Sequence, residues 1–299
     1  MSYTLDVKSE ILFKEMDTNE EHLWEIYAIL KGKLAIGQEK IELKLESLDL
    51  ANRVYKYLKE LVNLKISIKY SISKRFGEHR IYIIEIYKQK GYNSFIKRLE
   101  SLDKISYKNM SDSAITGFVK GLFLATGYLK DPNKEYAMDY FLDSDEMAYK
   151  LFEVLSFLDK RVFITDKRNK KLVYLRNSED IMDIMVLIGA VQSFFTYEEV
   201  TMMKDMKNKT IREINWEVAN ETKALDTADK QLLMIEYIDE KMGLHFLSDV
   251  LREMALARIN NPESSLSELA EIIGLSKSGV RNRFRRIEEV YNELKEENE

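Results

Sequence analysis

Basic and amide-bearing side chains are concentrated in one short segment near the carboxyl end of the chain, between residues 277 and 286. The segment holds five Lys or Arg residues and no acidic residue. Lysine and arginine neutralise DNA phosphates, and arginine and asparagine can make paired hydrogen bonds to guanine and adenine edges in the major groove. The pattern therefore indicates DNA binding. The candidate contact residues are Lys277, Ser278, Arg281, Asn282, Arg283, Arg285 and Arg286.

Two helices separated by a tight turn would position these side chains. The apolar residues before the turn follow the spacing i, i+3, i+4, i+7, which predicts one buried helical face. They are Leu266, Leu269, Ala270 and Ile273. Gly274 then permits the left-handed backbone of a tight turn, and Ser276 is a suitable N-cap for a second helix. This order predicts a helix-turn-helix.

The second helix has an apolar face and an opposite polar face. Its apolar residues Val280, Phe284 and Ile287 recur at i, i+4, i+7 and can pack back on the first helix. On the polar face we expect Lys277, Arg283 and Arg286 to anchor phosphates. Base edges would be read by Ser278, Arg281, Asn282 and Arg285. The alternative is a solvated basic helix in an ordinary three-helix bundle.

Length and composition limit the remaining classes of function. A chain of 299 residues with 45% hydrophobic content can form about two domains, and its net charge of -5 confines any DNA affinity to local patches. There is no cysteine, and the scattered His22, His79 and His245 predict no metal site. No cofactor motif, signal peptide or membrane-spanning run is recognised, so we expect a cytoplasmic protein without membrane association.

The first two thirds of the chain repeat one order of elements. Helix 20–31, strand 40–46, helix 48–61, strands 65–72 and 80–87 and helix 92–102 form the first set. The second set is helix 113–125, strand 136–142, helix 144–158, strands 161–165 and 171–176 and helix 178–190. Asp49 and Asp145 begin matching helices, and their separation of 96 residues is also that of Ile68 and Ile164.

We interpret this order as a tandem duplication of an αββαββα unit, with repeats at about 20–103 and 112–192. Each unit leaves one apolar sheet face and one apolar helix stripe. The two units can bury these together in one pseudo-symmetric domain. The alternative is that two α+β segments are similar by chance.

The run from Val119 to Gly127 resembles the LAGLIDADG helix of homing endonucleases, which pairs with its twin at the two-fold of a duplicated domain. Together with the helix-turn-helix, this resembles the WhiA family of bacterial sporulation and cell-division regulators. The same resemblance is carried by Val7, Lys8, Glu10, Asn215, Ala219, Asn220, Lys223, Gln231, Gly243, Leu251, Arg252, Glu253, Ala255, Arg258 and Pro262. It implies a degenerate LAGLIDADG domain joined to a carboxyl-terminal DNA-binding domain.

A LAGLIDADG nuclease needs an acidic residue at the end of each paired helix, because two carboxylates must hold the divalent metal. Here that position falls on Thr126 in the second copy, and on Lys31 or Lys33 in the first. A lysine repels the metal that an aspartate would bind. Asp145 is better explained as a helix cap, and Asp139, Asp143 and Glu146 as solvated surface. We therefore predict no catalytic residue and no enzyme.

The duplicated domain could still touch DNA through cations on its sheets and loops. Candidate secondary contacts are Lys65, Lys69, Arg75, Lys170 and Lys171, with Lys74 and Arg168 nearby. The alternative is that these residues protect exposed strands against aggregation. The acids Glu42, Glu46 and Glu85 on the same strands weaken the DNA interpretation. We expect Tyr197 and Trp216 to be core residues.

The predicted fold is α+β: a LAGLIDADG-like domain over residues 1–200, a helical connector over 201–226 and an all-α helix-turn-helix domain over 227–299. The predicted function is sequence-specific, non-catalytic DNA binding. The resemblance implies control of sporulation, cell division and chromosome segregation, nucleoid association, and RNA polymerase or another transcription factor as a further partner. The alternatives are a LAGLIDADG-type nuclease and a scaffold for transcription or division machinery. The sequence does not define an oligomeric state.

Overall fold

The structure is a computed structural model that describes residues 2–14, 18–73 and 79–296. The chain separates into two compact units, and the division falls between Lys204 and Asp205. The first unit is α+β and the second is all α-helical apart from short turns, so the predicted fold class is confirmed. In the described residues, no helix is both long enough and apolar enough to cross a membrane.

The first repeat contains α2 (Asn19–Gly32), β1 (Lys40–Leu45), α3 (Leu48–Leu61), β2 (Ser67–Ser73), β3 (His79–Tyr87) and α4 (Tyr92–Asp103). Its strands are antiparallel in the order β1-β3-β2. Alternation along β1 buries Ile41, Leu43 and Leu45 on one face of this sheet, where Ile84 and Ile86 of β3 are also buried. That face contributes to the core of the unit.

The second repeat contains α5 (Asp112–Thr126), β4 (Gly127–Leu129), β5 (Met138–Leu142), α6 (Asp145–Phe157), β6 (Val162–Lys167), β7 (Lys170–Leu175) and α7 (Ser178–Leu187). A short 3-10 helix, η1 (Tyr107–Asn109), precedes it. Its sheet has the order β4-β5-β7-β6 and is antiparallel throughout. This repeat has the full αββαββα order that the duplication predicts.

The first repeat departs from that order. Among the described residues, its leading strand is reduced to one isolated bridge between Ile36 and Ile41. The backbone turns too soon for a ladder, because Leu34 has a φ of 49° directly after α2. The prediction of two complete αββαββα units is therefore wrong for the first copy and correct for the second.

Serines cap the matching helices of the two repeats. The hydroxyl of Ser47 accepts from the Leu50 amide at 3.2 Å, and that of Ser144 accepts from the Met147 amide at 3.3 Å. Asp145 is the first residue of α6, inside the helix. The prediction that Asp145 caps this helix is wrong, although its charge still favours the positive end of the helix dipole.

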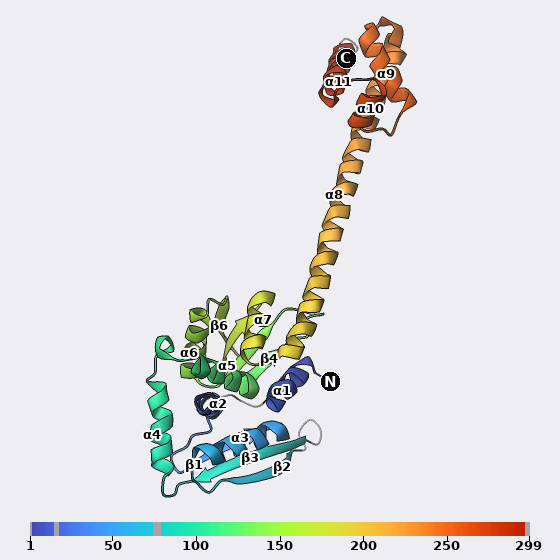
Figure 1. The fold of residues 1–299 in the computed structure, drawn as a ribbon. Helices are drawn as coiled ribbons and strands as arrows, with labels where there is room; N and C mark the ends of the chain where they lie inside the picture. The colour runs from blue at the N-terminus through green and yellow to red at the C-terminus, as the bar shows by residue number, and fades with distance from the viewer. Residues whose placement is uncertain (1, 15–17, 74–78, 297–299) are drawn as a thin grey trace. The chain divides into compact units, whose positions relative to one another are not determined.

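The two copies meet along α2 and α5, which lie between the two sheets (Figure 1). Small residues allow the helices to approach closely. A Cβ added at Gly121 would lie 2.5 Å from the Glu25 carbonyl oxygen, and one added at Gly32 would lie 2.8 Å from Leu122 Cδ2. Phe118, Leu122 and other residues of this pair belong to one continuous core. The expected pairing of the two LAGLIDADG-like helices is confirmed.

Helix α1 (Tyr3–Phe13) lies outside both repeats and fastens to the rest of the first unit. Val7 and Ile11 enter the core, and the Thr4 hydroxyl donates to the Leu129 carbonyl at 2.7 Å. The carboxylate of Glu10 accepts from the Gln192 amide at 2.7 Å and from the Ser193 amide at 2.9 Å. It thereby caps the start of α8 (Val191–Lys241).

Helix α8 has 51 residues and includes the expected connector, 201–226. Tyr197 is fully buried in the first unit, as predicted. Trp216 was expected in a core but is 69% exposed, so that prediction is wrong. The physical reason is that no other described element packs against α8 at this position. An aromatic residue alone does not provide a partner surface.

The second unit packs the end of α8 against η2 (Leu244–Phe246), α9 (Asp249–Asn260), α10 (Leu266–Ile272) and α11 (Lys277–Glu296). Its core includes Ile238, Met254, Leu269 and Phe284. These four residues belong to α8, α9, α10 and α11, in that order. The core therefore fixes α11 relative to the helices beneath it.

Candidate nucleic-acid interface

The turn between α10 and α11 follows the chemistry of its sequence. Ser265 and Glu268 form a capping box: the Ser265 amide donates to the Glu268 carboxylate at 2.7 Å, and the Glu268 amide donates to the Ser265 hydroxyl at 3.3 Å. Gly274 has a φ of 65°, the left-handed conformation predicted for it. The following Leu275 amide returns to the Ala270 carbonyl at 2.8 Å, which closes the turn.

Helix α11 begins as predicted and buries the predicted face. The Gly279 amide donates to the Ser276 hydroxyl at 3.1 Å, so Ser276 caps the helix. Val280, Phe284 and Ile287 are almost completely buried against the other helices. Because the helix turns once in about 3.6 residues, burial of these three directs the opposite face to solvent.

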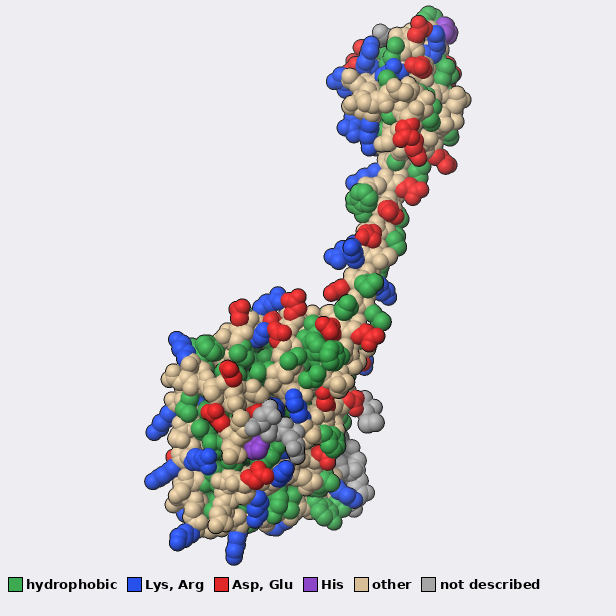
Figure 2. Space-filling model, viewed as in Figure 1, with side chains coloured by type: hydrophobic (Ala, Val, Ile, Leu, Met, Phe, Trp, Pro, Cys, Tyr) green, Lys and Arg blue, Asp and Glu red, His purple; other side chains and the backbone are tan. Residues whose placement is uncertain are grey.

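Most of the predicted contact residues lie on that solvent-facing side. The exposed members of the set are Lys277, Ser278, Arg281, Asn282, Arg285 and Arg286. Figure 2 shows Lys and Arg side chains gathered on the side of this unit where Figure 1 places α11. In the part of the chain that the structure describes, the cationic groups of Lys277, Arg281 and Arg286 have no hydrogen-bond or ion-pair partner. They are available to a phosphate or a base edge.

Asn282 and Arg285 are joined on this face. The Arg285 guanidinium donates to Asn282 Oδ1 at 3.0 Å, and its Nε lies 3.9 Å from a Glu289 carboxylate oxygen. Both contacts are solvent-exposed and therefore weak, so they can exchange for contacts to DNA. The hydrogen bond holds the amide and the guanidinium beside one another.

Arg283 is placed differently from the expectation. Its guanidinium donates to the Glu253 carboxylate of α9 at 2.8 Å, and its side chain is only 20% exposed. Arg283 stands three residues after Val280 and four before Ile287, so it shares the flank of the buried face. In this structure Arg283 ties α11 to α9, and its expected phosphate contact stays a prediction.

Arg258, for which the sequence predicted no role, organises the second unit. Arg258 is 1% exposed, and burial lowers its pKa. Its guanidinium donates to Gln231 Oε1 at 2.9 and 3.1 Å and to the Ser264 carbonyl at 2.5 Å, and it lies 5.6 Å from the centre of the Phe284 ring. One arginine thus connects α8, the α9–α10 loop and α11. Of the two arginines in α9, Arg258 is the one that stands directly between apolar residues, Ala257 and Ile259, and this was the available signal.

Three family models match successive parts of the chain. They are the WhiA N-terminal LAGLIDADG-like domain over residues 19–101, the WhiA LAGLIDADG-like domain over 115–207 and the WhiA C-terminal HTH domain over 211–291. A relative from Clostridium botulinum, named "Probable cell division protein WhiA", is 31% identical over 99% of both chains. The chain belongs to the WhiA family.

More distant relatives match all or part of the chain. The protein of the same name from Ligilactobacillus salivarius is 28% identical over 99% of this chain and 98% of its own. The crystal structure of full-length WhiA from Thermatoga maritima covers 98% of both chains with a TM-score of 0.60 and 24% identity. The N-terminal LAGLIDADG domain of WhiA covers 62% of this chain and 89% of its own, with a TM-score of 0.51 and 22% identity.

The helix ends of this WhiA-family chain carry no carboxylate at the positions where a LAGLIDADG nuclease holds its metal. Thr126 ends α5, and its hydroxyl donates to the Leu122 carbonyl at 2.8 Å. At the end of α2, Lys31 pairs with Asp103 at 2.7 Å, and Lys33 is the residue after Gly32. Among the described residues, no group of three or more His, Asp or Glu could hold a metal ion.

The predicted secondary cations are mostly paired with acids. Lys69 lies 2.5 Å from Glu85, Lys170 lies 2.9 Å from Asp143, and Lys171 lies 2.7 Å from Asp166. The hydrogen bond from Lys69 is the largest cause that lowers the pKa of Glu85. Lys65 has no ion pair among the described residues, and Arg75 and Lys74 lie outside them. These sheet cations therefore form local ion pairs instead of one open basic surface.

Proposed function

We propose that this chain is a sequence-specific DNA-binding regulator of transcription whose contact surface is the exposed face of α11. The observation that carries the proposal is the division of this helix. Val280, Phe284 and Ile287 fix it to the core, while cations and an amide face solvent on the other side. A helix-turn-helix places such a helix in the major groove, where its side chains reach base edges.

The exposed side chains of α11 would make different kinds of contact with DNA. Lys277 at the start of α11 and Arg286 further along would bind phosphates and set the register of the helix on DNA. Arg281, Asn282 and Arg285 lie between them and offer the donors and acceptors that distinguish guanine and adenine. Ser278 is small and close to the helix start, so its hydroxyl would contact either a base edge or a phosphate.

The relatives are named for cell division, which supports a role of this chain in cell division. We propose control of sporulation and chromosome segregation as well, on the resemblance to the WhiA family alone. Such a role places it on the nucleoid in the cytoplasm, with RNA polymerase or another transcription factor as a partner. Double-stranded DNA remains the central ligand of the proposal.

The proposed regulator is non-catalytic. Phosphodiester hydrolysis in this fold needs carboxylates that hold a divalent metal at the ends of the paired helices. The Thr126 hydroxyl at the end of α5 donates to the Leu122 carbonyl, and lysines flank Gly32 at the end of α2. A local positive charge repels a divalent cation. The test is magnesium-dependent nicking of supercoiled plasmid, in which we expect no product above a buffer control.

Selection from a random pool of double-stranded DNA tests sequence specificity directly. The full-length chain is expected to enrich one short motif, and fluorescence anisotropy should then show affinity for the motif well above that for a scrambled duplex. Affinity for both duplexes should fall as salt rises, because phosphate contacts release counterions.

Arg281→Ala and Lys295→Ala provide a matched pair for this assay, since both remove one cation from α11 and only the first lies in the contact segment. The first is expected to relax the enriched motif at one position and the second to leave it unchanged. The proposal would be contradicted if the chain enriched no motif. It would also be contradicted if both variants enriched the same motif and bound it with equal affinity.

A further inference from the structure

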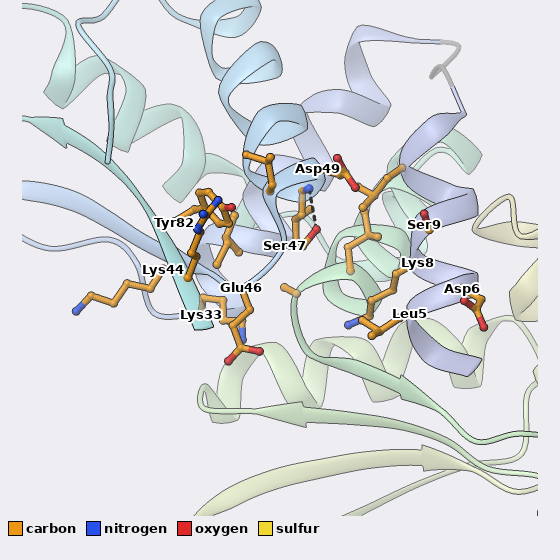
Figure 3. A pocket seen from close by; sticks show the side chains of 17 residues that line it. Leu5, Asp6, Lys8, Ser9, Lys33, Lys44, Glu46, Ser47, Asp49 and Tyr82 are labelled. Carbon is orange, nitrogen blue, oxygen red and sulfur yellow. Dashed lines mark hydrogen bonds between the residues drawn. The ribbon is translucent and has the colours of Figure 1, made fainter. Parts of the chain in front are cut away.

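A large hollow lies within the first unit, where α1 approaches the turn between β1 and α3 (Figure 3). Its volume of about 1040 Å³ is comparable to that of small-molecule sites. Lys33 after α2 and Leu124 near the end of α5 also border it. The hollow therefore adjoins the end of the helix pair, and all its walls belong to one compact unit.

Cations from separate elements line this hollow. They are Lys8 of α1, Lys33, Lys44 of β1 and Arg80 of β3. Lys44 pairs with Glu42 at 2.8 Å and extends away from Lys8 and Lys33 in Figure 3. Within the described residues, the ammonium groups of Lys8 and Lys33 have no hydrogen-bond or ion-pair partner. Arg80 lies 5.9 Å from the centre of the Tyr70 ring, and Lys8 lies 5.6 Å from that of Phe123. Lys8 and Lys33 are the cations that we assign to a ligand.

The surroundings of Lys8 and Lys33 disfavour the charged forms of both side chains when no ligand is bound. Burial lowers the pKa of Lys8 to about 8, and the charge of Lys33 lowers it further, against the opposing effect of Glu46. Burial is also the largest cause that lowers the pKa of Lys33. Lys33 is itself exposed, so an anion bound between the two ammonium groups would mainly offset their mutual repulsion and the lost hydration of Lys8.

The hollow also presents groups that match the rest of a ligand. Figure 3 shows Lys8 and Glu46 pointing to the same side of the hollow, with Lys33 beside Glu46. The Glu46 carboxylate can accept hydrogen bonds from hydroxyl or amino groups. Leu5 and Leu124 supply apolar wall, and Tyr82 supplies an aromatic ring. The first turn of α3 adds backbone amides. One of them, the Leu50 amide, already donates to the Ser47 hydroxyl.

We propose that this hollow binds a nucleotide, with Lys8 and Lys33 holding its phosphate groups, Glu46 accepting from a ribose hydroxyl or base amine, and the apolar wall covering the base. A phosphate on its own would leave Glu46 beside like charge. A purely apolar ligand would leave both lysines unpaired. A phosphorylated molecule with hydroxyl or amine donors and a flat apolar part satisfies all three groups.

The test is isothermal titration calorimetry of the full-length chain with ATP, ADP, AMP and inorganic phosphate as separate probes. We expect one nucleotide per chain. The Lys8→Met, Lys33→Met double variant is expected to bind at least about tenfold more weakly, because it removes two charge-assisted contacts to phosphate. Lys56→Met, Lys97→Met is the control: it removes the same charge from exposed positions outside the hollow.

Glu46→Gln supplies a second test that does not depend on the folding of the double variant. It should weaken ATP and AMP binding without weakening that of inorganic phosphate, since Glu46 would contact the nucleoside part and stands beside a phosphate only as a like charge. The proposal is overturned if no nucleotide binds at millimolar concentration, or if the control variant loses as much affinity as the pocket variant. It is also overturned if the pocket variant weakens only binding to a random-sequence DNA duplex, which would assign the lysines to the DNA backbone.

Discussion

The buried guanidinium of Arg258 donates two hydrogen bonds to Oε1 of Gln231, at 2.9 and 3.1 Å. Gln231 is on α8 and Arg258 is on α9, so the pair fixes the angle between the helices that support α10 and α11. A third nitrogen contact reaches the Ser264 carbonyl in the loop before α10. The exposed contact face of α11 therefore depends on a polar contact in the core beneath it.

Arg258→Met should destabilise the second unit by about 2 to 4 kcal/mol, because it leaves the buried Gln231 side-chain carbonyl oxygen and the half-buried Ser264 carbonyl without the donors of Arg258. Hydrogen-exchange mass spectrometry should show faster exchange in α10, with the first unit unaffected. Arg252→Met is the control, since the Arg252 side chain is 40% exposed and its one ion pair among the described residues is with Asp249. Equal exchange of α10 in both variants would contradict this role.

Arg283 and Arg286 should differ in their effect on DNA binding despite their proximity. Arg286→Ala removes an exposed cation, so it should weaken all duplexes about equally and lower the salt dependence by about one counterion. Arg283→Ala removes the contact to Glu253, so it should mainly lower the melting temperature of the second unit. Titration of DNA at several salt concentrations separates the two effects. A loss of DNA affinity for Arg283→Ala equal to that for Arg286→Ala, without loss of stability, would refute the assignment.

Gly121→Ala should destabilise the first unit by about 1 to 3 kcal/mol, because the added methyl group meets the Glu25 backbone and forces α2 and α5 apart. Gly279→Ala in α11 is the matched control. Its Cβ would lie no closer than 3.4 Å to the Ser276 hydroxyl, so alanine should stabilise that helix by up to about 1 kcal/mol. Urea unfolding of each variant measures both changes. The same sign for both would contradict the proposed helix contact.

Lys8→Met should raise the melting temperature at neutral pH. The pKa of Lys8 in the folded chain is about 8, below its ordinary value of 10.5, so folding disfavours the charged form. The destabilisation is complete below about pH 8 and disappears as pH rises to 10.5. After allowance for solvent screening, we expect a gain on the order of 1 kcal/mol.

Melting curves across this pH range test that sign, with Lys56→Met as the control because Lys56 is exposed. A gain for Lys8→Met that does not shrink at high pH would show that charge is not its cause.

Amphipathic patterns predicted much of the fold. The limits of α3 agree with those predicted, because its apolar stripe and its serine cap are both local features. The αββαββα order requires a strand directly after α5, but the residues of β4 escaped prediction, since the three residues Gly127–Leu129 are too few to show an alternation. Trp216 was misjudged because burial depends on a neighbouring element, and the sequence does not say which helix lacks one.

Some features of the candidate site could be predicted from the sequence and others could not. The exposed face of α11 followed from the spacing of Val280, Phe284 and Ile287, a property of one helix. The ion pair between Arg283 and Glu253 and the hydrogen bonds between Arg258 and Gln231 join different helices, so no local pattern encodes them. The hollow beside Lys8 and Lys33 likewise arises only when α1 lies against the β1–α3 turn.

The central claim, sequence-specific DNA binding by α11, is tested most directly by genome-wide crosslinking and immunoprecipitation of the chain in its own cells. The comparison is with an Arg281→Ala, Arg285→Ala double variant produced at the same level. We predict sharp peaks that share one short sequence and disappear in the variant. Diffuse enrichment that the two substitutions do not change would contradict the assignment of α11 as the recognition helix.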